Sequence, residues 1–433
     1  IMHLLSKNNY FSILLALIPI SFITGNLVIN LIVILLIFST IFFYKTSPLQ
    51  VKFYFLDKLL FIFFALVILT GFINDYELQY IKNYEWYGFF PSLIKSLLFL
   101  KYLLLYICLR FLIEKEIISL KFFFISCFLC VIFVSLDLFY QFINGEDIFG
   151  YQLVGVRKLS GPFGDELIAG GYLQRFSLFA FFTIPLFFKN FPKKYSLLIN
   201  LLLFLIILSG IILSGNRFPL ILFLLLIFLV VFFEKQNRKY FLKVVISFLI
   251  IFVLLFNLST NVKKNFKTFY YEFNKIRVTL VKGDMDKPFA PTYLKEFYSF
   301  YNTWLLNKYI GGGIKNFRLY CHFRKDSSVH KCNMHPHNYY LEILTETGLI
   351  GFVNIMIIFM LLLYISFYKK YFTKSSLQKN SIIIPFMFLF MTEIFPLRSS
   401  GSFFTTGTAV YLFFLIGILV GLIRKNESIE KIK

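Results

Sequence analysis

Long apolar runs dominate the chain and, apart from one long polar stretch, follow one another with only short polar breaks. A helix needs about 20 apolar residues to cross the hydrocarbon core of a bilayer. Runs approaching that length recur along the whole sequence, in which 58% of the residues are hydrophobic and only 15% are charged. We therefore expect an all-α polytopic membrane protein with about 12 transmembrane helices. The expected spans are residues 9–24, 27–44, 54–73, 92–113, 120–143, 167–188, 195–213, 218–233, 241–257, 350–368, 381–397 and 404–423.

The basic residues lie between the apolar runs, so the net charge of +22 does not indicate a nucleic-acid-binding protein. If the N-terminus lies in the cytoplasm, the cytoplasmic ends and short loops hold 20 Lys and Arg, and the short loops of the other side hold five. Cytoplasmic loops of membrane proteins carry such an excess. We therefore expect both termini in the cytoplasm. A lone cleavable signal peptide is not expected, because many further apolar runs follow the first.

One long polar stretch, residues 258–349, follows the ninth expected span and therefore lies on the outer side. We expect residues 1–433 to form a single integral membrane domain, with 258–349 as a loop subdomain between the ninth and tenth spans. After Thr292, aromatic residues recur at helical spacing up to Trp304. This pattern predicts a helix that lies in the membrane interface or packs on the bundle.

Three isolated Arg residues on the outer side oppose the charge trend, so each needs a local reason. A guanidinium group grips phosphate with two parallel hydrogen bonds, which makes these residues candidate phosphate ligands. The alternative is that they reach lipid headgroups or pair with a nearby acid such as Glu166 or Glu393. Asp137 and Arg175 are weaker candidates of the same kind. The three isolated Arg residues of the outer side are Arg157, Arg217 and Arg398.

Histidine and cysteine gather in one short window of the outer loop. Four of the five His, together with Cys321 and Cys332, fall between residues 321 and 337. These residue types can bind zinc, but their spacing matches no standard zinc finger. A Cys321–Cys332 disulfide is the favoured interpretation, because the outer side is an oxidising compartment. We therefore expect no metal site, and zinc stays open as the alternative.

The most specific motif is His337-Asn338, followed by nine residues and then Gly348-Leu349-Ile350-Gly351. The nine residues predict a helix start that turns at Gly348 into the tenth span. An imidazole at the membrane surface can accept a proton from a hydroxyl group at neutral pH. A loop His that is structural or merely solvated is the alternative interpretation.

This motif resembles the signature of the O-antigen ligase family, which also takes in O-antigen polymerases. The turn Ser214-Gly215-Asn216-Arg217 looks like the family's short outer turn ending in Arg, although many members carry Ser where this chain has Asn216. Residues 313–318 resemble the family's Gly-rich turn before the His. About twelve spans with one long outer loop between the ninth and tenth is also the family's plan. The resemblance covers roughly residues 150–403.

The resemblance implies glycosyl transfer at the periplasmic face of the bacterial inner membrane. The donor would be a glycan on undecaprenyl diphosphate. The acceptor would be a sugar hydroxyl, on lipid A–core for a ligase or on another lipid-linked glycan for a polymerase. The reaction would invert the anomeric centre and need neither metal nor cofactor. Membrane lipid is the remaining expected partner, and no nucleic acid is expected.

The resemblance and the chemistry of the residues together suggest a role for each candidate. His337 is the candidate catalytic base. Arg217, Arg157 and Arg398 would bind the diphosphate and stabilise the negative charge that develops on it. A transporter or flippase of lipid-linked oligosaccharides is the alternative class, but it predicts related halves and ionisable residues near the bilayer midplane. The expected supporting residues are Asn338, Glu166, Glu393, Gly348 and Gly351.

Overall fold

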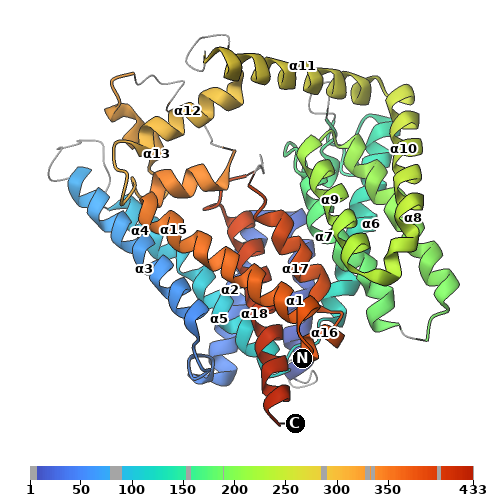
Figure 1. The fold of residues 1–433 in the computed structure, drawn as a ribbon, viewed down its shortest axis with the longest axis horizontal. Helices are drawn as coiled ribbons and strands as arrows, with labels where there is room; N and C mark the ends of the chain where they lie inside the picture. The colour runs from blue at the N-terminus through green and yellow to red at the C-terminus, as the bar shows by residue number, and fades with distance from the viewer. Residues whose placement is uncertain are drawn as a thin grey trace.

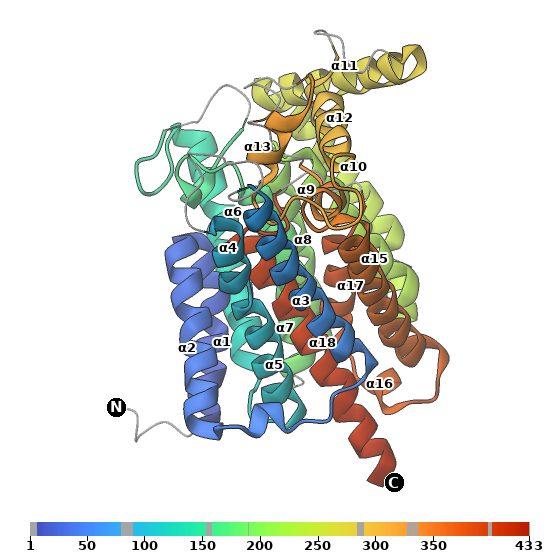
Figure 2. The ribbon, with the colours of Figure 1, turned by 90° about the vertical axis from the view of Figure 1, so that its left-hand side faces the viewer.

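The computed structural model of the chain is a bundle of α-helices (Figures 1 and 2). It describes residues 7–78, 90–152, 158–188, 190–283, 290–326, 332, 337–396 and 401–432. Among these residues there is no β-strand, only an isolated bridge between Glu146 and Gln152. The helices are α1 (Lys7–Thr24), α2 (Asn26–Tyr44), α3 (Phe55–Tyr76), α4 (Pro91–Phe99), α5 (Lys101–Glu114), α6 (Lys121–Asn144), α7 (Ala169–Phe187), α8 (Lys193–Leu213), α9 (Arg217–Phe233), α10 (Phe241–Leu258), α11 (Thr260–Lys282), α12 (Thr292–Trp304), α13 (Phe317–Tyr320), α15 (Tyr339–Phe367), α16 (Ser376–Lys379), α17 (Ile383–Glu393) and α18 (Thr406–Ile432).

The expected spans coincide with helices of this bundle. They correspond to α1, α2, α3, the α4–α5 pair, α6, α7, α8, α9, α10, α15, α17 and α18. Within the described residues, eight helical segments are long and apolar enough to cross a membrane, by length and composition. Helices α1, α9 and α17 are apolar but shorter. The all-helical membrane class is therefore confirmed, and the count of twelve crossings stays a prediction.

Helix α18 is the buried centre of the bundle and packs most extensively on α5. Two glycines four residues apart, Gly417 and Gly421, permit the close approach. A Cβ atom added at Gly421 would lie 2.8 Å from the Cβ of Ile113, and one at Gly417 would lie 3.1 Å from the Cβ of Leu109. Small residues at this spacing let two apolar helices meet backbone to backbone, which increases their van der Waals contact.

The segments expected in the cytoplasm meet at one end of the bundle. Lys425 near the end of α18 pairs with Glu116 at 3.0 Å, and Tyr371 after α15 donates to Glu234 after α9 at 3.1 Å. Helix α18 ends on this side, and α11 crosses the opposite end (Figure 2). The loops that carry the basic excess therefore share one end of the molecule.

Two helices of the long polar stretch lie across the other end (Figures 1 and 2). Helix α12 begins at Thr292, where the aromatic spacing predicted a helix. Helix α11 was not expected, because it contains no long apolar run. Its start is nevertheless marked in the sequence: the hydroxyl group of Ser259 accepts a hydrogen bond from the Val262 amide at 3.2 Å. Gly283, with a φ of 72°, ends it.

Helix α15 bends sharply at Gly348, as the motif predicted. This residue has φ 65° and ψ −173°, a backbone region that is essentially restricted to glycine. The bend lies against the chain that follows α12, so a Cβ atom at Gly348 would lie 2.2 Å from the carbonyl oxygen of Tyr309. Gly351 leaves room for the side chain of Thr347, whose hydroxyl oxygen would lie 2.3 Å from an added Cβ. Gly348 therefore shapes the backbone, and Gly351 makes room for a neighbouring side chain.

We expect Gly348→Ala to destabilise the folded chain by at least about 3 kcal/mol, because a strained backbone of about 1–3 kcal/mol is combined with a direct clash. The midpoint of thermal unfolding in detergent measures the effect. The matched control is Gly171→Ala in α7, where nothing lies within 4 Å of an added Cβ atom. Equal midpoints for the two variants would contradict the proposed role of the bend.

Candidate active site

A cavity of about 1020 Å³ lies at the end of the bundle where α11 and α12 cross it. Its wall combines the turn between α1 and α2, the starts of α7, α9, α15 and α18, and the inner side of α11. These helix ends come from distant parts of the sequence, so only folding brings them together. The charged side chains of the wall, together with the imidazole of His337, are those of Lys158, Glu166, Arg175, Arg217 and Glu272.

His337 immediately precedes Asn338, the N-cap residue of α15, and faces the cavity. Its neighbour Asn338 caps the helix: the side-chain oxygen accepts hydrogen bonds from the amides of Tyr340 at 3.0 Å and Leu341 at 3.1 Å. The Asn338 amide nitrogen donates to the carbonyl oxygen of Pro396 at 2.8 Å. His337 itself has a φ of 46°, an uncommon conformation for a residue other than glycine. The cap therefore positions the backbone that presents the imidazole.

Arg217 is the first residue of α9 and lines the same cavity. A cation at a helix N-terminus is unfavourable, so partners on α11 compensate for it. Its Nε donates to the side-chain oxygen of Asn265 at 2.8 Å, and its Nη1 donates to Glu272 at 2.8 Å. The guanidinium carbon lies 5.3 Å from the ring centre of Phe269. Nη2 donates to none of the described residues, so one edge of the group is available to a ligand.

Asn216, which stands where many members of the resembled family carry Ser, ties the start of α9 to the start of α7. Its side-chain oxygen accepts from the Gly170 amide and its nitrogen donates to the Leu167 carbonyl, both at 3.1 Å. A Cβ atom at Gly170 would lie 2.8 Å from the Cβ of Asn216. The longer amide thus makes two hydrogen bonds across the helices, and a single hydroxyl group could not span both.

Tyr293 on α12 lines the same cavity as the two candidate residues. Its ring centre is 6.1 Å from that of His337. Burial is the main reason why the pKa of Tyr293 is raised; the charges of Glu272 and Glu296 also raise the pKa, and the charge of Arg217 lowers it. Tyr293 is therefore close to both His337 and the Arg217–Glu272 pair. The structure thus brings His337 and Arg217 to one cavity, although 120 residues separate them in the sequence.

Glu296, one turn further along α12, is a buried acid that the sequence did not single out. Its side chain is 7% exposed, and the oxygen Oε2 makes no hydrogen bond among the described residues. Burial raises the pKa of Glu296 to about 7, because the charged form is disfavoured away from water. A sizeable fraction is therefore protonated near neutral pH, which weakens the negative charge beside Tyr293.

A second ion pair, between Arg175 of α7 and Glu393 of α17, braces the cavity wall. Nη2 and Nε of Arg175 donate to the two carboxylate oxygens of Glu393 at 2.7 and 3.1 Å. The hydroxyl group of Tyr339 also donates to Glu393, at 3.1 Å. Glu393 is fully buried, whereas Arg175 is 15% exposed and lines the cavity. Because Tyr339 follows Asn338, this network also supports the His337 turn.

The other residues that the sequence suggested for the site differ in where they lie. Glu166 is exposed and lines the cavity. Arg157 and Arg398 lie outside the described residues, so their contacts stay predictions. Gly348 and Gly351 do not line the cavity; Gly348 forms the bend of α15, and Gly351 leaves room for the Thr347 side chain. The structure also adds Lys158, Glu272 and Tyr293 to the expected site, and it places Arg175, a weaker candidate from the sequence, in the cavity wall. Of these four residues, only Arg175, an Arg inside an apolar run, had a clear sequence signal.

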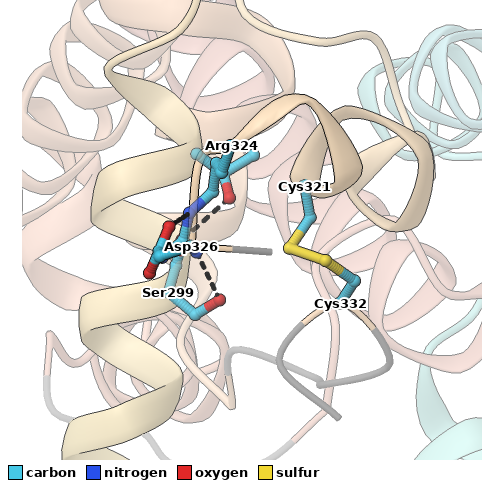
Figure 3. Close-up of a disulfide and its surroundings, with 6 residues drawn as sticks. Ser299, Cys321, Arg324, Asp326 and Cys332 are labelled. Atoms are coloured by element: carbon cyan, nitrogen blue, oxygen red, sulfur yellow. Dashed lines mark hydrogen bonds and ion pairs between the residues drawn. A yellow bond between two sulfur atoms is a disulfide. The ribbon is translucent and has the colours of Figure 1, made fainter. Parts of the chain in front are cut away.

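Cys321 and Cys332 are joined in a disulfide with a Cα–Cα distance of 5.3 Å (Figure 3). They pack with Phe300 and Phe317, whose stacked rings have centres 3.6 Å apart. Next to the disulfide, Nη1 of Arg324 donates to the Ser299 hydroxyl at 2.7 Å (Figure 3). Thiolates are the form of cysteine that binds zinc, and the disulfide removes both. The described residues also contain no group of three or more His, Cys, Asp or Glu arranged to hold a metal ion.

Residues 202–356 match the protein family described as O-Antigen ligase. The matched range runs from α8 into α15 and therefore contains Arg217, His337, Asn338, Gly348 and Gly351. It confirms the resemblance that these residues indicated. Comparison with curated proteins gives no match.

We expect Glu393→Ala to destabilise the protein by about 3 kcal/mol, since it leaves the Arg175 cation without its partner. This value is the lower end of the range for breaking a buried ion pair, because the Arg175 side chain is partly exposed to the cavity. Thermal unfolding in detergent measures the loss. The double variant Arg175→Leu/Glu393→Leu should recover part of it, because no unpaired charge remains. Equal losses in both would show that packing, and not charge pairing, supports this wall.

Proposed function

Because residues 202–356 match the O-antigen ligase family, we propose that this chain transfers a glycan from undecaprenyl diphosphate to a sugar hydroxyl on lipid A–core. The family supports an activity of O-antigen ligase or polymerase type in a bacterial membrane. One observation supports the site most strongly. A candidate base, His337, and a candidate phosphate ligand, Arg217, line one cavity at an end of the apolar bundle.

Arg217 would bind the diphosphate of the donor. The group is 20% exposed, and its partner Glu272 is 41% exposed, so an arriving phosphate can replace the carboxylate with little desolvation. The guanidinium would then donate two hydrogen bonds to phosphate oxygens. Lys158 and Arg175 add positive charge to the same wall. We propose Arg157 and Arg398 as further diphosphate ligands.

His337 would act as the general base. Its imidazole removes the proton of the acceptor hydroxyl as the oxygen attacks the anomeric carbon of the donor sugar. The bond between that carbon and the phosphate oxygen breaks, and its electron pair stays on the diphosphate. Arg217 stabilises this charge as it develops. Attack from the face opposite the leaving group inverts the anomeric centre, and no cofactor takes part.

The proposed orientation places the cavity on the periplasmic side of the inner membrane and both termini in the cytoplasm. The support is the basic excess of the loops at the opposite end of the bundle. Residues 258–349, which contain α11 and α12, would then form the periplasmic loop subdomain. The donor's lipid would remain in the bilayer while its diphosphate enters the cavity at the membrane surface.

We expect His337→Ala to lower transfer by about 10²–10⁴-fold, the range for loss of a general base. Arg217→Lys should lower it by about 10²-fold or more, because an ammonium group does not reproduce a two-pronged guanidinium contact. The assay combines purified protein with lipid-linked donor and lipid A–core, and it measures glycan transferred to the core. Longer lipid-linked chains in place of this product would assign the chain to the polymerase type.

Two variants control for these changes. His322→Ala removes an exposed His of the same loop that does not line the cavity, and Arg238→Lys changes an Arg at the other end of the bundle. Both should keep wild-type activity. Full activity in Arg217→Lys would mean that charge alone suffices, and full activity in His337→Ala would remove the base from the mechanism.

We also expect chelation by EDTA to leave transfer largely intact. The positive charge that a metal ion would supply to the diphosphate comes from Arg side chains, and the cavity carboxylate nearest to Arg217, Glu272, is already paired with it. The measurement is transfer rate before and after EDTA treatment of the purified protein. A loss restored by magnesium or manganese would contradict the Arg-based mechanism and would point to a metal held by acidic residues.

A further inference from the structure

We propose that the outward face of α11 binds the anionic sugars of the acceptor glycan. This inference rests on the proposed function and adds a binding surface outside the cavity. The face is defined by the exposed residues Lys263, Lys264, Lys267, Tyr270, Tyr271 and Arg277.

The charges of α11 are divided between two sides of the helix. Glu272, its only acidic residue, faces the cavity and pairs with Arg217. With Val262, Asn265, Phe269, Ile276 and Thr279 it forms a stripe at helical spacing whose members are buried or line the cavity. The outward face lies on the opposite side of the helix. It contains four cations and no acid, and none of these cations forms an ion pair with a described residue.

The same face exposes aromatic rings that the fold does not use. Tyr270 is 75% exposed and Tyr271 is 67% exposed, although a ring of this size is normally at least partly covered. Tyrosine combines a flat apolar ring with a polar hydroxyl group, which suits contact with surfaces that are partly polar. Sugars present such surfaces, and phosphate or carboxylate groups on them would pair with the neighbouring Lys side chains.

The course of α11 argues against a lipid bilayer as the occupant of this face. The exposed apolar side of α10 ends at Leu258, and the chain then turns at Ser259 so that α11 runs across the end of the bundle (Figure 1). A bilayer surrounds the sides of the bundle. The inner side of α11 looks toward the cavity, so its outer side looks away from the membrane and into water. A soluble polyanion can reach it there.

We favour the acceptor as the occupant of this face, because the most strongly charged group of the donor, its diphosphate, already has a proposed binding site in the cavity. The proposed mechanism pairs the donor diphosphate with Arg217 inside the cavity, and its lipid holds it in the bilayer. The acceptor sugar must be held against His337 without that phosphate contact. A basic surface on the far side of the helix that lines the cavity would supply the missing affinity and raise the association rate through electrostatic attraction.

Binding of a model polyanion tests the surface without relying on transfer. Full-length protein in detergent is titrated with fluorescent dextran sulfate and with neutral dextran of the same length. We expect dextran sulfate to bind, neutral dextran to bind at least ten-fold more weakly, and added salt to weaken the former. The variant Lys263→Gln/Lys264→Gln/Lys267→Gln should bind dextran sulfate at least ten-fold more weakly. The matched control removes three exposed Lys from the other end of the bundle and should bind as the wild type does: Lys235→Gln/Lys239→Gln/Lys243→Gln.

Transfer kinetics then show whether the face binds the acceptor or the donor. In the transfer assay the α11 variant should raise the KM for the acceptor at least five-fold and leave kcat and the KM for the donor near wild type. A higher donor KM alone would overturn the acceptor assignment. Equal dextran sulfate binding by the α11 and control variants would overturn the surface itself.

Three further outcomes separate the competing explanations. Phosphatidylglycerol vesicles that bind the wild type, but not the α11 variant, would assign the face to lipid and overturn the proposal. A wild type that binds dextran sulfate through these Lys residues but transfers nothing would support the anionic surface and count against the proposed function. Transfer with normal acceptor KM in the α11 variant would leave the proposed function intact and reject this inference.

Discussion

Backbone hydrogen bonds between the loop after α12 and the bend of α15 hold the candidate active site in place. A bend interrupts the helical ladder and leaves amide and carbonyl groups without partners, which is unfavourable near a bilayer. Here the loop satisfies them, and its glycines let the two backbones touch. The bonds are Gly312 N to Thr345 O, Gly313 N to Glu346 O and Leu349 N to Lys308 O, each 2.9 Å, and Ile350 N to Tyr309 O, 3.3 Å.

This pairing sets the direction of the first segment of α15 and hence the position of His337. A second contact ties the same loop to the bundle, since the side chain of Asn74 on α3 donates to the carbonyl oxygen of Gly311 at 2.8 Å. The imidazole therefore stands on a segment anchored at both ends, by the Asn338 cap and by the bend at Gly348. An anchored base needs little reorganisation before it can accept a proton.

The two Arg residues of the cavity wall differ in what a ligand could displace. Arg217 pairs with Glu272, which is 41% exposed, whereas Arg175 pairs with Glu393, which is fully buried. Breaking the Arg217–Glu272 pair leaves a carboxylate that water can still solvate, so the cost is small. Breaking the Arg175–Glu393 pair leaves a buried carboxylate without a partner, which is strongly unfavourable. Arg217 is thus suited to exchange partners with a substrate. Arg175 is suited to hold the wall that carries Tyr339.

The length of the apolar runs predicted most of the helical bundle because a bilayer constrains every spanning segment in the same way. It failed for α11, whose amphipathic, basic sequence contains no span-like run and whose helix ends at Ser259 and Gly283 are only local signals. The sequence indicated His337 and Arg217 through their motif and their place on the outer side. It did not indicate Glu272 or Tyr293, since nothing in a loop sequence shows which polar residue will face another.

The sequence alone thus determined the helical membrane class, the clustering of basic loops and the glycine-dependent bend, because each follows from local composition, length or backbone geometry. Only the tertiary structure decided which polar groups share the cavity. Arg217 meets α11 and His337 meets Tyr293 because helices distant in the chain end at the same place, and long-range packing of this kind leaves no mark at any single position. Whether an Arg is paired with an exposed or a buried acid is decided there too, and that choice separates the exchangeable cation from the structural one.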